Sequence, residues 1–210
     1  MELTFYDYWA SSAAYRVRIV LNLKGADFRG IEIDLLKGEQ GAEAYRAVNP
    51  QALVPALVVE DDTVITQSLA IIDFLDAKFP EPRMVPRDPL ARARVLSQAL
   101  VIACDVHPLN NLRVRNYLRD ELGVDEAGAI RWMHRWMSEG FAALEAEAPE
   151  EGLFGGETPN LADVCLVPQM YNARRFNLPL DPYPRLVRID SACRALDSFA
   201  QAAPEAVRPK

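Results

Sequence analysis

The chain has 210 residues, half of them hydrophobic and a quarter charged, which is an ordinary composition for a globular protein. Lysine and arginine number 23 against 30 aspartate and glutamate residues, so the formal net charge is −7. That sign argues against nucleic acid or an anionic membrane surface as the main partner. No apolar run approaches the ~20 residues that span a bilayer, and we expect no signal peptide.

The three cysteines are widely spaced and form no CxxC pair. They are Cys104, Cys165 and Cys193. Since the two histidines do not cluster with them, we predict no metal site. We expect all three thiols to be packed as small apolar side chains in a reducing cytoplasm.

The first eighty residues mix strand and helix signals. The predicted elements are a strand over 2–9, an amphipathic helix over 13–23 ended by Gly25, a strand over 28–34, a brief helix over 39–49, two strands over 54–65 across a turn at Asp61–Asp62, and a helix over 67–79. This order suggests an α/β unit with a mixed sheet.

A proline-rich stretch follows, and strand signals disappear beyond it. We interpret residues 81–88 as a linker and 89–210 as an all-helical domain after an α/β domain over 1–80. The predicted helices cover 90–118 with an interruption at Pro108, 126–147, 160–176 and 183–196, and the tail after Pro204 is expected to fray.

Three short stretches favour an anion-binding site. Two serines, Ser11 and Ser12, precede the first helix, where one can cap the free N–H groups and the other can donate its hydroxyl to an anion. Pro55 stands at the entry to a strand, either as a terminator or as a turn that presents the backbone of Val54. The pair Gln67-Ser68 begins another helix, where Ser68 is either a cap or part of a carboxylate site.

These stretches together resemble one enzyme family. "SSAAYRVRIVLNLKG", "NPQALVPAL", "QSLAII", "DVHPLNN" and "NLADVCLVPQMYNARRF" follow in the order found in the zeta class of glutathione transferases, the maleylacetoacetate and maleylpyruvate isomerases. The resemblance covers nearly the whole chain. It implies a thioredoxin-like N-terminal domain with a mixed four-stranded sheet, a helical-bundle C-terminal domain for substrate, and glutathione as cofactor.

The resemblance also implies roles for individual residues. Ser11 and Ser12 would lie beside the glutathione thiol, with Ser11 as the closer donor, and Val54 before Pro55 would pair with the cysteinyl backbone. The remaining implied cofactor contacts are Gln67 and Ser68 for the γ-glutamyl group, Gln40, and His107 and Asn111, which line the same cleft. The substrate arginines would be Arg175, a second one at Arg113, and Arg174 as a neighbour.

In these isomerases the thiolate adds to a cis double bond of an oxo-dicarboxylate, the bond rotates, and elimination restores glutathione. Ser11, Ser12 and Arg175 are then the expected catalytic residues. The chain departs from the family pattern at Ala10 and Ala13, where arginine and cysteine are usual. The missing arginine puts the usual dicarboxylate clamp in question.

Other hypotheses remain open at this point. One is a zeta-like transferase that conjugates or dehalogenates small α-substituted acids, and another is a non-catalytic glutathione-fold binding protein. A nucleophilic Cys104–His107 pair is a minor alternative, and His134 between Trp132 and Trp136 is read as packed or surface-exposed. We assign "PNLADV" to folding, as a capping box. A cytoplasmic homodimer is expected from the family resemblance.

Overall fold

The computed structural model describes residues 2–209 and divides into two compact units. Unit 1 comprises the chain up to Met84 together with the segment from Ala195 onward, and unit 2 is Val85–Arg194. The expected extent of the helical domain, 89–210, is therefore wrong at its C-terminal end. The chain after Ala195 returns to unit 1 because its helix α10 packs against α1.

The elements of unit 1 follow the predicted order. They are β1 (Thr4–Asp7), α1 (Ser12–Leu23), β2 (Arg29–Glu32), η1 (Glu39–Gly41), α2 (Glu43–Val48), β3 (Ala56–Val58), η2 (Glu60–Asp62), β4 (Val64–Thr66) and α3 (Ser68–Lys78), followed after unit 2 by α10 (Asp197–Ala200) and α11 (Pro204–Val207).

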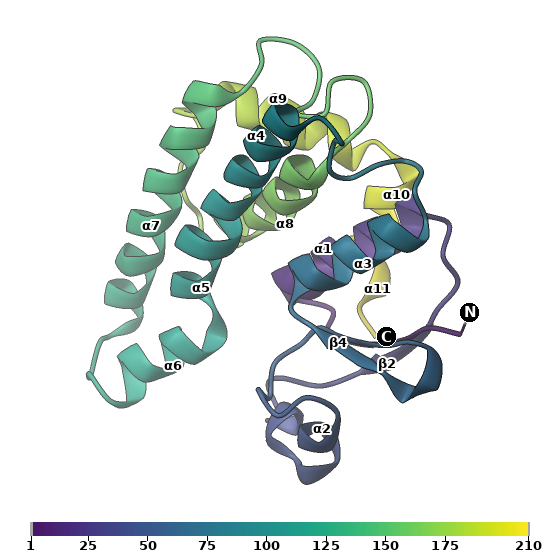
Figure 1. Cartoon of the computed structure of the whole chain (residues 1–210). Coiled ribbons are helices and arrows are strands. Elements are labelled where there is room, and N and C mark those ends of the chain that lie inside the picture. Colours follow the sequence, from purple (N-terminus) through teal and green to yellow (C-terminus); the bar gives the residue numbers. More distant parts are fainter. Residues whose placement is uncertain (1, 210) are drawn as a thin grey trace. The chain divides into compact units, whose positions relative to one another are not determined.

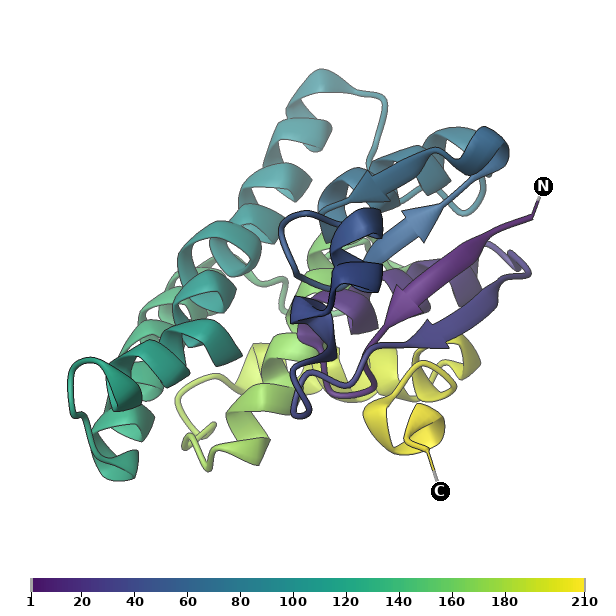
Figure 2. The same ribbon diagram turned by 90° about the horizontal axis from the view of Figure 1, so that it is seen from below.

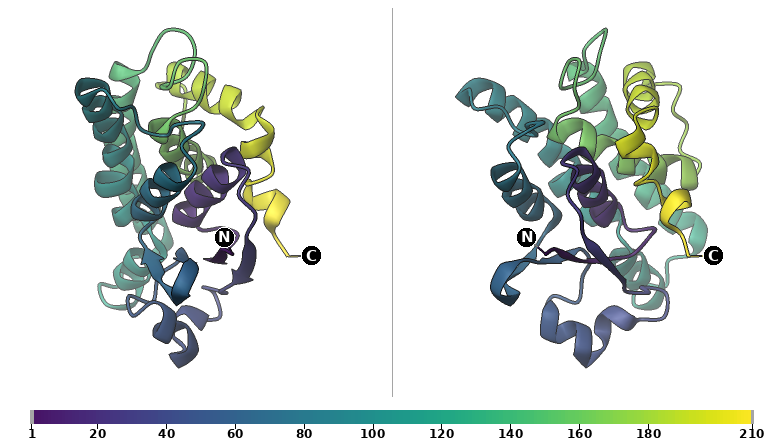
Figure 3. Two further views of the ribbon diagram at one scale, coloured as in Figure 1. Left: turned by 45° about the vertical axis from the view of Figure 1, so that its right-hand side comes forward. Right: turned by 90° about the vertical axis from the view of Figure 1, so that its right-hand side faces the viewer.

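The four strands form one mixed sheet, in the order β2-β1-β3-β4. β1 runs parallel to β2, whereas β3 is antiparallel to both β1 and β4, as the view in Figure 2 displays. Helices α1 and α3 lie side by side on one face of the sheet and α2 lies on the other (Figure 1 and Figure 3). The mixed four-stranded sheet of the predicted fold is confirmed.

Helix α1 is buried on every side from Ala14 to Leu21, although its sequence predicts an amphipathic helix. Its two arginines, Arg16 and Arg18, are 2% and 3% exposed. The C-terminal segment covers the side of α1 that carries Arg18, whose guanidinium donates from Nε to the carbonyl oxygen of Ala202 at 2.9 Å. Arg16 lies on another side, where its guanidinium donates to the Ser68 hydroxyl at 3.3 Å. The segment Pro204–Val207 is helical, with Pro204 buried, so the fraying expected there is wrong.

Gly25 ends α1 as predicted. Its φ of 57° places it in the left-handed region that glycine adopts without strain. The N–H of Gly25 donates to Asn22 and that of Ala26 donates to Leu21, which is the Schellman arrangement.

A buried ion pair anchors the start of the linker to unit 1. The ammonium of Lys24 donates to Asp76 at 2.7 Å and to the carbonyl oxygens of Phe79 and Pro82 at 2.6 Å each. The same Asp76 carboxylate accepts the N–H of Met84 at 2.8 Å. The proline-rich segment is therefore fixed by a charge network at its beginning.

Unit 2 is built from helices, and several long ones run alongside one another in Figure 1. They are α4 (Pro89–Leu100), the π-helical turn η3 (Val101–Val106), α5 (His107–Asn110), α6 (Leu112–Asp120), α7 (Glu126–Glu147), α8 (Leu161–Arg175) and α9 (Pro184–Arg194). Over residues 2–209, no helix is both long enough and apolar enough for a membrane span.

The sequence predicts an interruption of the first long helix of unit 2 at Pro108, but the helix continues past this residue. It passes through the π-helical turn η3, continues as α5 and ends at Asn111, whose ψ is 165°. Proline has no N–H to donate to the carbonyl oxygen four residues earlier. The helical hydrogen bonds change to the wider π-helical spacing just before it. The extra residue in that turn changes the phase of the helix, and Cys104 is exposed there, not packed.

The predicted capping box at the start of α8 is confirmed. The side chain of Asn160 accepts from the N–H of Asp163, while the Asp163 carboxylate accepts from the N–H of Asn160 at 2.9 Å. The same carboxylate accepts from Phe154 and Gly155 at 2.9 and 3.0 Å, so one fully buried side chain closes the preceding loop. Burial raises the pKa of Asp163 to about 6, and the backbone donors oppose that rise.

This raised pKa predicts a specific pH dependence of stability. The folded pKa of about 6 lies above the ordinary 3.8, so the fold binds the Asp163 proton more tightly than the unfolded chain does. The unfolding free energy of the natural chain should fall by about 3 kcal/mol, relative to Asp163→Asn, as pH rises from about 3 to 7. Urea unfolding at several pH values measures this. Asp181→Asn, at an exposed position, is the control, and an equal pH profile for Asp163→Asn and the natural chain would contradict the assignment.

Candidate active site

Ser11 stands at the N-terminus of α1 as its cap. Its hydroxyl oxygen accepts from the N–H of Ala14 at 3.2 Å, and its backbone is extended, with φ −78° and ψ 119°. A hydroxyl that accepts through a lone pair keeps its own hydrogen to donate. Half-buried Ser11 can therefore cap the helix and donate to an anion at once, whereas Ser12, the first helical residue, is only 6% exposed.

The buried side chain of Arg18 holds the loop that leads to Ser11. One guanidinium nitrogen of Arg18 lies 2.6 and 2.8 Å from the two carboxylate oxygens of Asp7, at the end of β1. The other donates to the carbonyl oxygen of Trp9 at 3.0 Å. Because Trp9 is two residues before Ser11, this buried cation fixes the path of the chain into the helix.

The Val54–Pro55 peptide bond is cis, and the segment before it is anchored by α2. The carbonyl oxygen of Leu53 accepts from the Tyr45 hydroxyl at 2.6 Å and from the Asn49 amide at 2.7 Å. Burial raises the pKa of Tyr45 to about 12, so its hydroxyl stays a donor at neutral pH. Among residues 2–209, no group bonds to the N–H or C=O of Val54. Those are the groups that the cysteinyl backbone of glutathione would need.

The start of α3 carries backbone strain. Gln67 has φ 71° and ψ 120°, a region that residues other than glycine rarely enter, and its side chain donates to Gln51 at 2.9 Å. Gln67 is the N-cap position, so the alternative that Ser68 caps the helix is wrong. The buried Ser68 hydroxyl accepts from Arg16 at 3.3 Å. The free N–H groups of this helix end suit a carboxylate such as that of a γ-glutamyl group.

Gln40 adds a second indication that a polar ligand fits unit 1. Its side-chain carbonyl oxygen is buried and has no hydrogen-bond partner in the described part of the chain. A buried acceptor without a donor is costly, and a ligand N–H would satisfy it. The unpaired backbone of Val54 and this oxygen are therefore consistent with a peptide-like cofactor.

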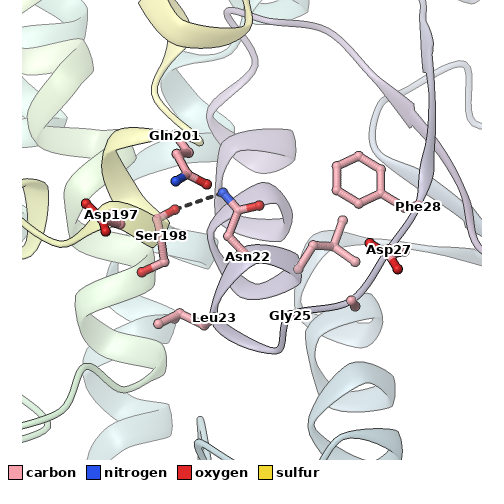
Figure 4. A pocket seen from close by; sticks show the side chains of 10 residues that line it. Asn22, Leu23, Gly25, Asp27, Phe28, Asp197, Ser198 and Gln201 are labelled. Atoms are coloured by element: carbon pink, nitrogen blue, oxygen red, sulfur yellow. Dashed lines mark hydrogen bonds between the residues drawn. The ribbon is translucent and has the colours of Figure 1, made fainter.

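Unit 1 also has a hollow at a different place from the serines. A hollow of about 610 Å³ lies at the C-terminal end of α1, where Asn22 donates to the carbonyl oxygen of Ser198 at 3.0 Å (Figure 4). With a rise of 1.5 Å per residue, that end of α1 is about 16 Å from Ser12. Its polar rim includes Asp27 and Asp197. It therefore cannot hold a thiol beside the serines.

In unit 2, Asn111 has a folding role. Its side chain caps α6 by accepting from the N–H of Val114 at 3.2 Å. His107 is half-buried in α5, and Arg113 is exposed on α6. Contacts of these three residues with cofactor or substrate stay predictions.

Arg174 is engaged by the protein itself. Its guanidinium pairs with the carboxylate of Asp190, which is fully buried and also accepts from Arg194 at 3.0 Å. Removing a partner of a buried carboxylate is costly. This ion pair gives Arg174 a role in the fold, and its contact with substrate stays a prediction.

Near Arg175 lies Arg115, a residue that the sequence analysis missed. Its guanidinium carbon lies 5.4 Å from the centre of the Phe176 ring, and that of Arg115 lies 4.7 Å from the same centre. Burial lowers the pKa of Arg115, and the positive charge of Arg175 lowers it further. The only available signal was the alternation of Arg113 and Arg115 on α6, which does not tell which of them faces α8.

His134 is packed, as expected. Its Nε2 lies 2.7 Å from the carbonyl oxygen of Phe176, so this nitrogen carries the proton. The three cysteines form no disulfide with one another, and burial raises the pKa of Cys193. No group of histidine, cysteine and acidic side chains suited to a metal ion is found within residues 2–209.

The geometry of unit 1 agrees with comparisons to known proteins. Residues 10–78 match the glutathione S-transferase N-terminal domain model. A maleylpyruvate isomerase from Ralstonia is 44% identical over 211 residues, covering 97% of this chain and 98% of the relative. The chain belongs to the zeta class of glutathione transferases.

Solved structures support the same conclusion. The holo structure of a bacterial maleylpyruvate isomerase of the zeta class superposes with a TM-score of 0.94 at 43% identity and full coverage of both chains. A maleylacetoacetate isomerase from Methylobacterium extorquens, solved with malonate and glutathione, gives 0.91 at 36% identity and 98% coverage of each. The predicted family and fold are confirmed. The chain is an enzyme, and glutathione is its cofactor.

The structure also places a cation beside the position where the family arginine is missing. The guanidinium of Arg208, from the C-terminal segment, lies 4.7 Å from the centre of the Trp9 ring. Trp9 directly precedes Ala10. The sequence pattern alone could not indicate this neighbour, because the two residues are at opposite ends of the chain.

Arg18→Met should damage both the fold and the site. The variant leaves the Asp7 carboxylate, which is 18% exposed, without its cation, at a cost of about 3–5 kcal/mol in unfolding free energy. We also expect weaker glutathione binding, because the loop before Ser11 loses its support. Chemical denaturation and calorimetric titration with glutathione measure the two effects. Arg29→Met, on the exposed strand β2, is the matched control, and equal stability of the two variants would refute the role of Arg18.

Proposed function

We propose that this zeta-class enzyme is a glutathione-dependent cis–trans isomerase of a conjugated oxo-dicarboxylate, either maleylpyruvate or maleylacetoacetate. Bound glutathione supplies a thiolate that adds reversibly to the double bond and leaves again after rotation. The observation that carries the proposal is the position of Ser11, a helix cap whose hydroxyl hydrogen is available at the N-terminus of α1. The names of the relatives support the substrate class.

Ser11 and the N-terminus of α1 would together lower the pKa of the glutathione thiol. A free thiol has a pKa near 8.5, and lowering it to about 6.5 requires about 2.7 kcal/mol of preference for the anion. A helix N-terminus provides about 0.3–1 kcal/mol and a hydroxyl donor to a charged acceptor about 1.5–3 kcal/mol. The two together reach the required value, whereas the helix end alone does not.

Arg175 would hold a substrate carboxylate. It is exposed at the last turn of α8, and its stacking on Phe176 leaves the N–H groups at the guanidinium edge available for a carboxylate. A carboxylate held in this way would orient the substrate and stabilise the enolate that forms during addition. Arg113 is retained as a further candidate for the same task.

The test of the proposed function is turnover with unconsumed cofactor. Purified enzyme should convert maleylpyruvate or maleylacetoacetate to the trans isomer only when glutathione is present, at many turnovers per glutathione. Stoichiometric thioether formation with α-halo acids, without isomerisation, would instead favour a conjugating transferase. Glutathione binding with no turnover of any electrophile would favour the non-catalytic alternative.

Ser11→Ala should raise the pKa of the bound thiol by about 1 or more, since one charge-assisted hydrogen bond is lost. It should also cost about 1 kcal/mol of stability through the lost cap. Ultraviolet titration of the thiolate and thermal unfolding measure the two effects. Ser12→Ala is the neighbouring comparison, and a larger effect there would transfer the donor role to Ser12. Unchanged titration curves in both variants would reject the serine mechanism.

We also propose that the enzyme works in aromatic catabolism as a cytoplasmic homodimer. Three cysteines that form no disulfide are consistent with a reducing compartment. Light scattering would give the subunit number. A ring-cleaving dioxygenase encoded beside this gene would support the pathway and distinguish the two substrates.

A further inference from the structure

Two guanidinium groups of unit 2 share one aromatic ring. Arg115 comes from α6 and Arg175 from the end of α8, and they lie 4.7 and 5.4 Å from the centre of the Phe176 ring. We call these three residues the arginine cluster. Phe176 is held in place because its carbonyl oxygen accepts from His134 on α7. Three helices thus position the cluster.

The charges in the cluster are poorly balanced. The carboxylate nearest to Arg115 is that of Glu126, at 3.7 Å, and its side chain is 71% exposed. An exposed pair at that distance contributes little. Glu126 exerts the largest charge effect on Arg115, and the like charges of Arg175 and Arg119 oppose it. The cluster itself holds two cations and no carboxylate. The environment of Arg115 therefore favours an additional anion.

Arg115 also has an unused donor. Its Nε is buried and has no hydrogen-bond partner in the described part of the chain, although only 24% of the side chain is exposed. A guanidinium presents its N–H groups in a planar fork that matches a carboxylate. By contrast, Arg18 donates to groups of the protein from Nε and from both terminal nitrogens.

Arg113 does not lie on the same side of α6 as Arg115. Residues two apart on a helix point to nearly opposite sides, since each residue turns by about 100°. With Arg115 directed toward Phe176, the side chain of Arg113 leaves α6 in another direction. The two arginines of "LRVR" therefore differ in what they face, and Arg115 is the one beside Arg175.

We infer that Arg115 acts with Arg175 as a carboxylate-holding pair that positions the dicarboxylate substrate. The inference rests on the proposed function and adds a residue to it. The pair would supply a second positive charge in an enzyme that has alanine at position 10, where the family usually has arginine. A single carboxylate bridging both guanidinium groups would satisfy the buried donor and relieve the repulsion.

The test uses Arg115→Met in the full-length enzyme, with malonate as the probe. Methionine keeps the apolar packing on Phe176 and removes the charge. We expect malonate to raise the melting temperature of the natural enzyme, and its dissociation constant to rise about 10- to 100-fold in the variant. The KM for the substrate should rise by a similar factor with a smaller change in kcat, and glutathione affinity should stay the same.

Stability without ligand provides an independent readout. Removing one of two repelling cations should leave the melting temperature of Arg115→Met unchanged or higher, whereas loss of a structural arginine would lower it. Arg115→Lys keeps the charge without the fork and should bind malonate with intermediate strength. Arg135→Met, an exposed arginine paired with Glu139 on α7, is the control and should behave like the natural enzyme.

The outcomes separate the inference from the proposed function. Malonate binding and KM unchanged in Arg115→Met, in an enzyme that does isomerise, would overturn the inference alone. Absence of malonate binding to the natural enzyme would overturn it as well. Loss of malonate binding in the variant of an enzyme without isomerase activity would support the arginine pair and contradict the proposed reaction.

Discussion

The buried guanidinium of Arg18 makes the contacts that hold together the part of unit 1 that leads to Ser11. It joins the end of β1, the loop before Ser11 and the C-terminal segment through Asp7, Trp9 and Ala202. A buried charge is tolerated only when it is paired and its donors are bonded, so the three segments must be present together. The helix N-terminus that would stabilise a thiolate is therefore built by residues from both ends of the chain.

The same principle distinguishes structural from functional arginines in this protein. Arg18 is itself buried and pairs with Asp7, and Arg174 pairs with the fully buried Asp190, so both charges serve the fold. Arg115 and Arg175 share an aromatic ring and repel each other, and the carboxylate that pairs with Arg115 is the exposed one of Glu126. Unbalanced charge costs stability, and it persists in proteins mostly where a ligand of opposite sign restores the balance. That imbalance is the basis of the carboxylate site proposed for unit 2.

Several residues of unit 1 that the family resemblance assigns to glutathione carry backbone strain or polar groups without a protein partner in the described part of the chain. Gln67 has an uncommon backbone conformation, and the side chain of Gln40 and the backbone of Val54 offer groups without protein partners. Elsewhere in the unit, the Lys24–Asp76 pair and the bonds to Leu53 satisfy the polar groups they bury. A site that must bind a peptide keeps its own hydrogen-bonding groups available.

Local patterns in the sequence were sufficient for the order of strands and helices, the Gly25 stop, the capping box of Asn160 and Asp163, and the family itself. Each depends on residues close together in the chain, where spacing and turn chemistry decide. Contacts between distant segments could not be predicted in this way. The return of the C-terminal segment to unit 1, the burial of Arg16 and Arg18, the pairing of Arg174 with Asp190, and the choice of Arg115 over Arg113 beside Phe176 depend on which helix faces meet. Packing of the folded chain decides that, because a side chain's partner is set by its neighbours in space and not by those in sequence.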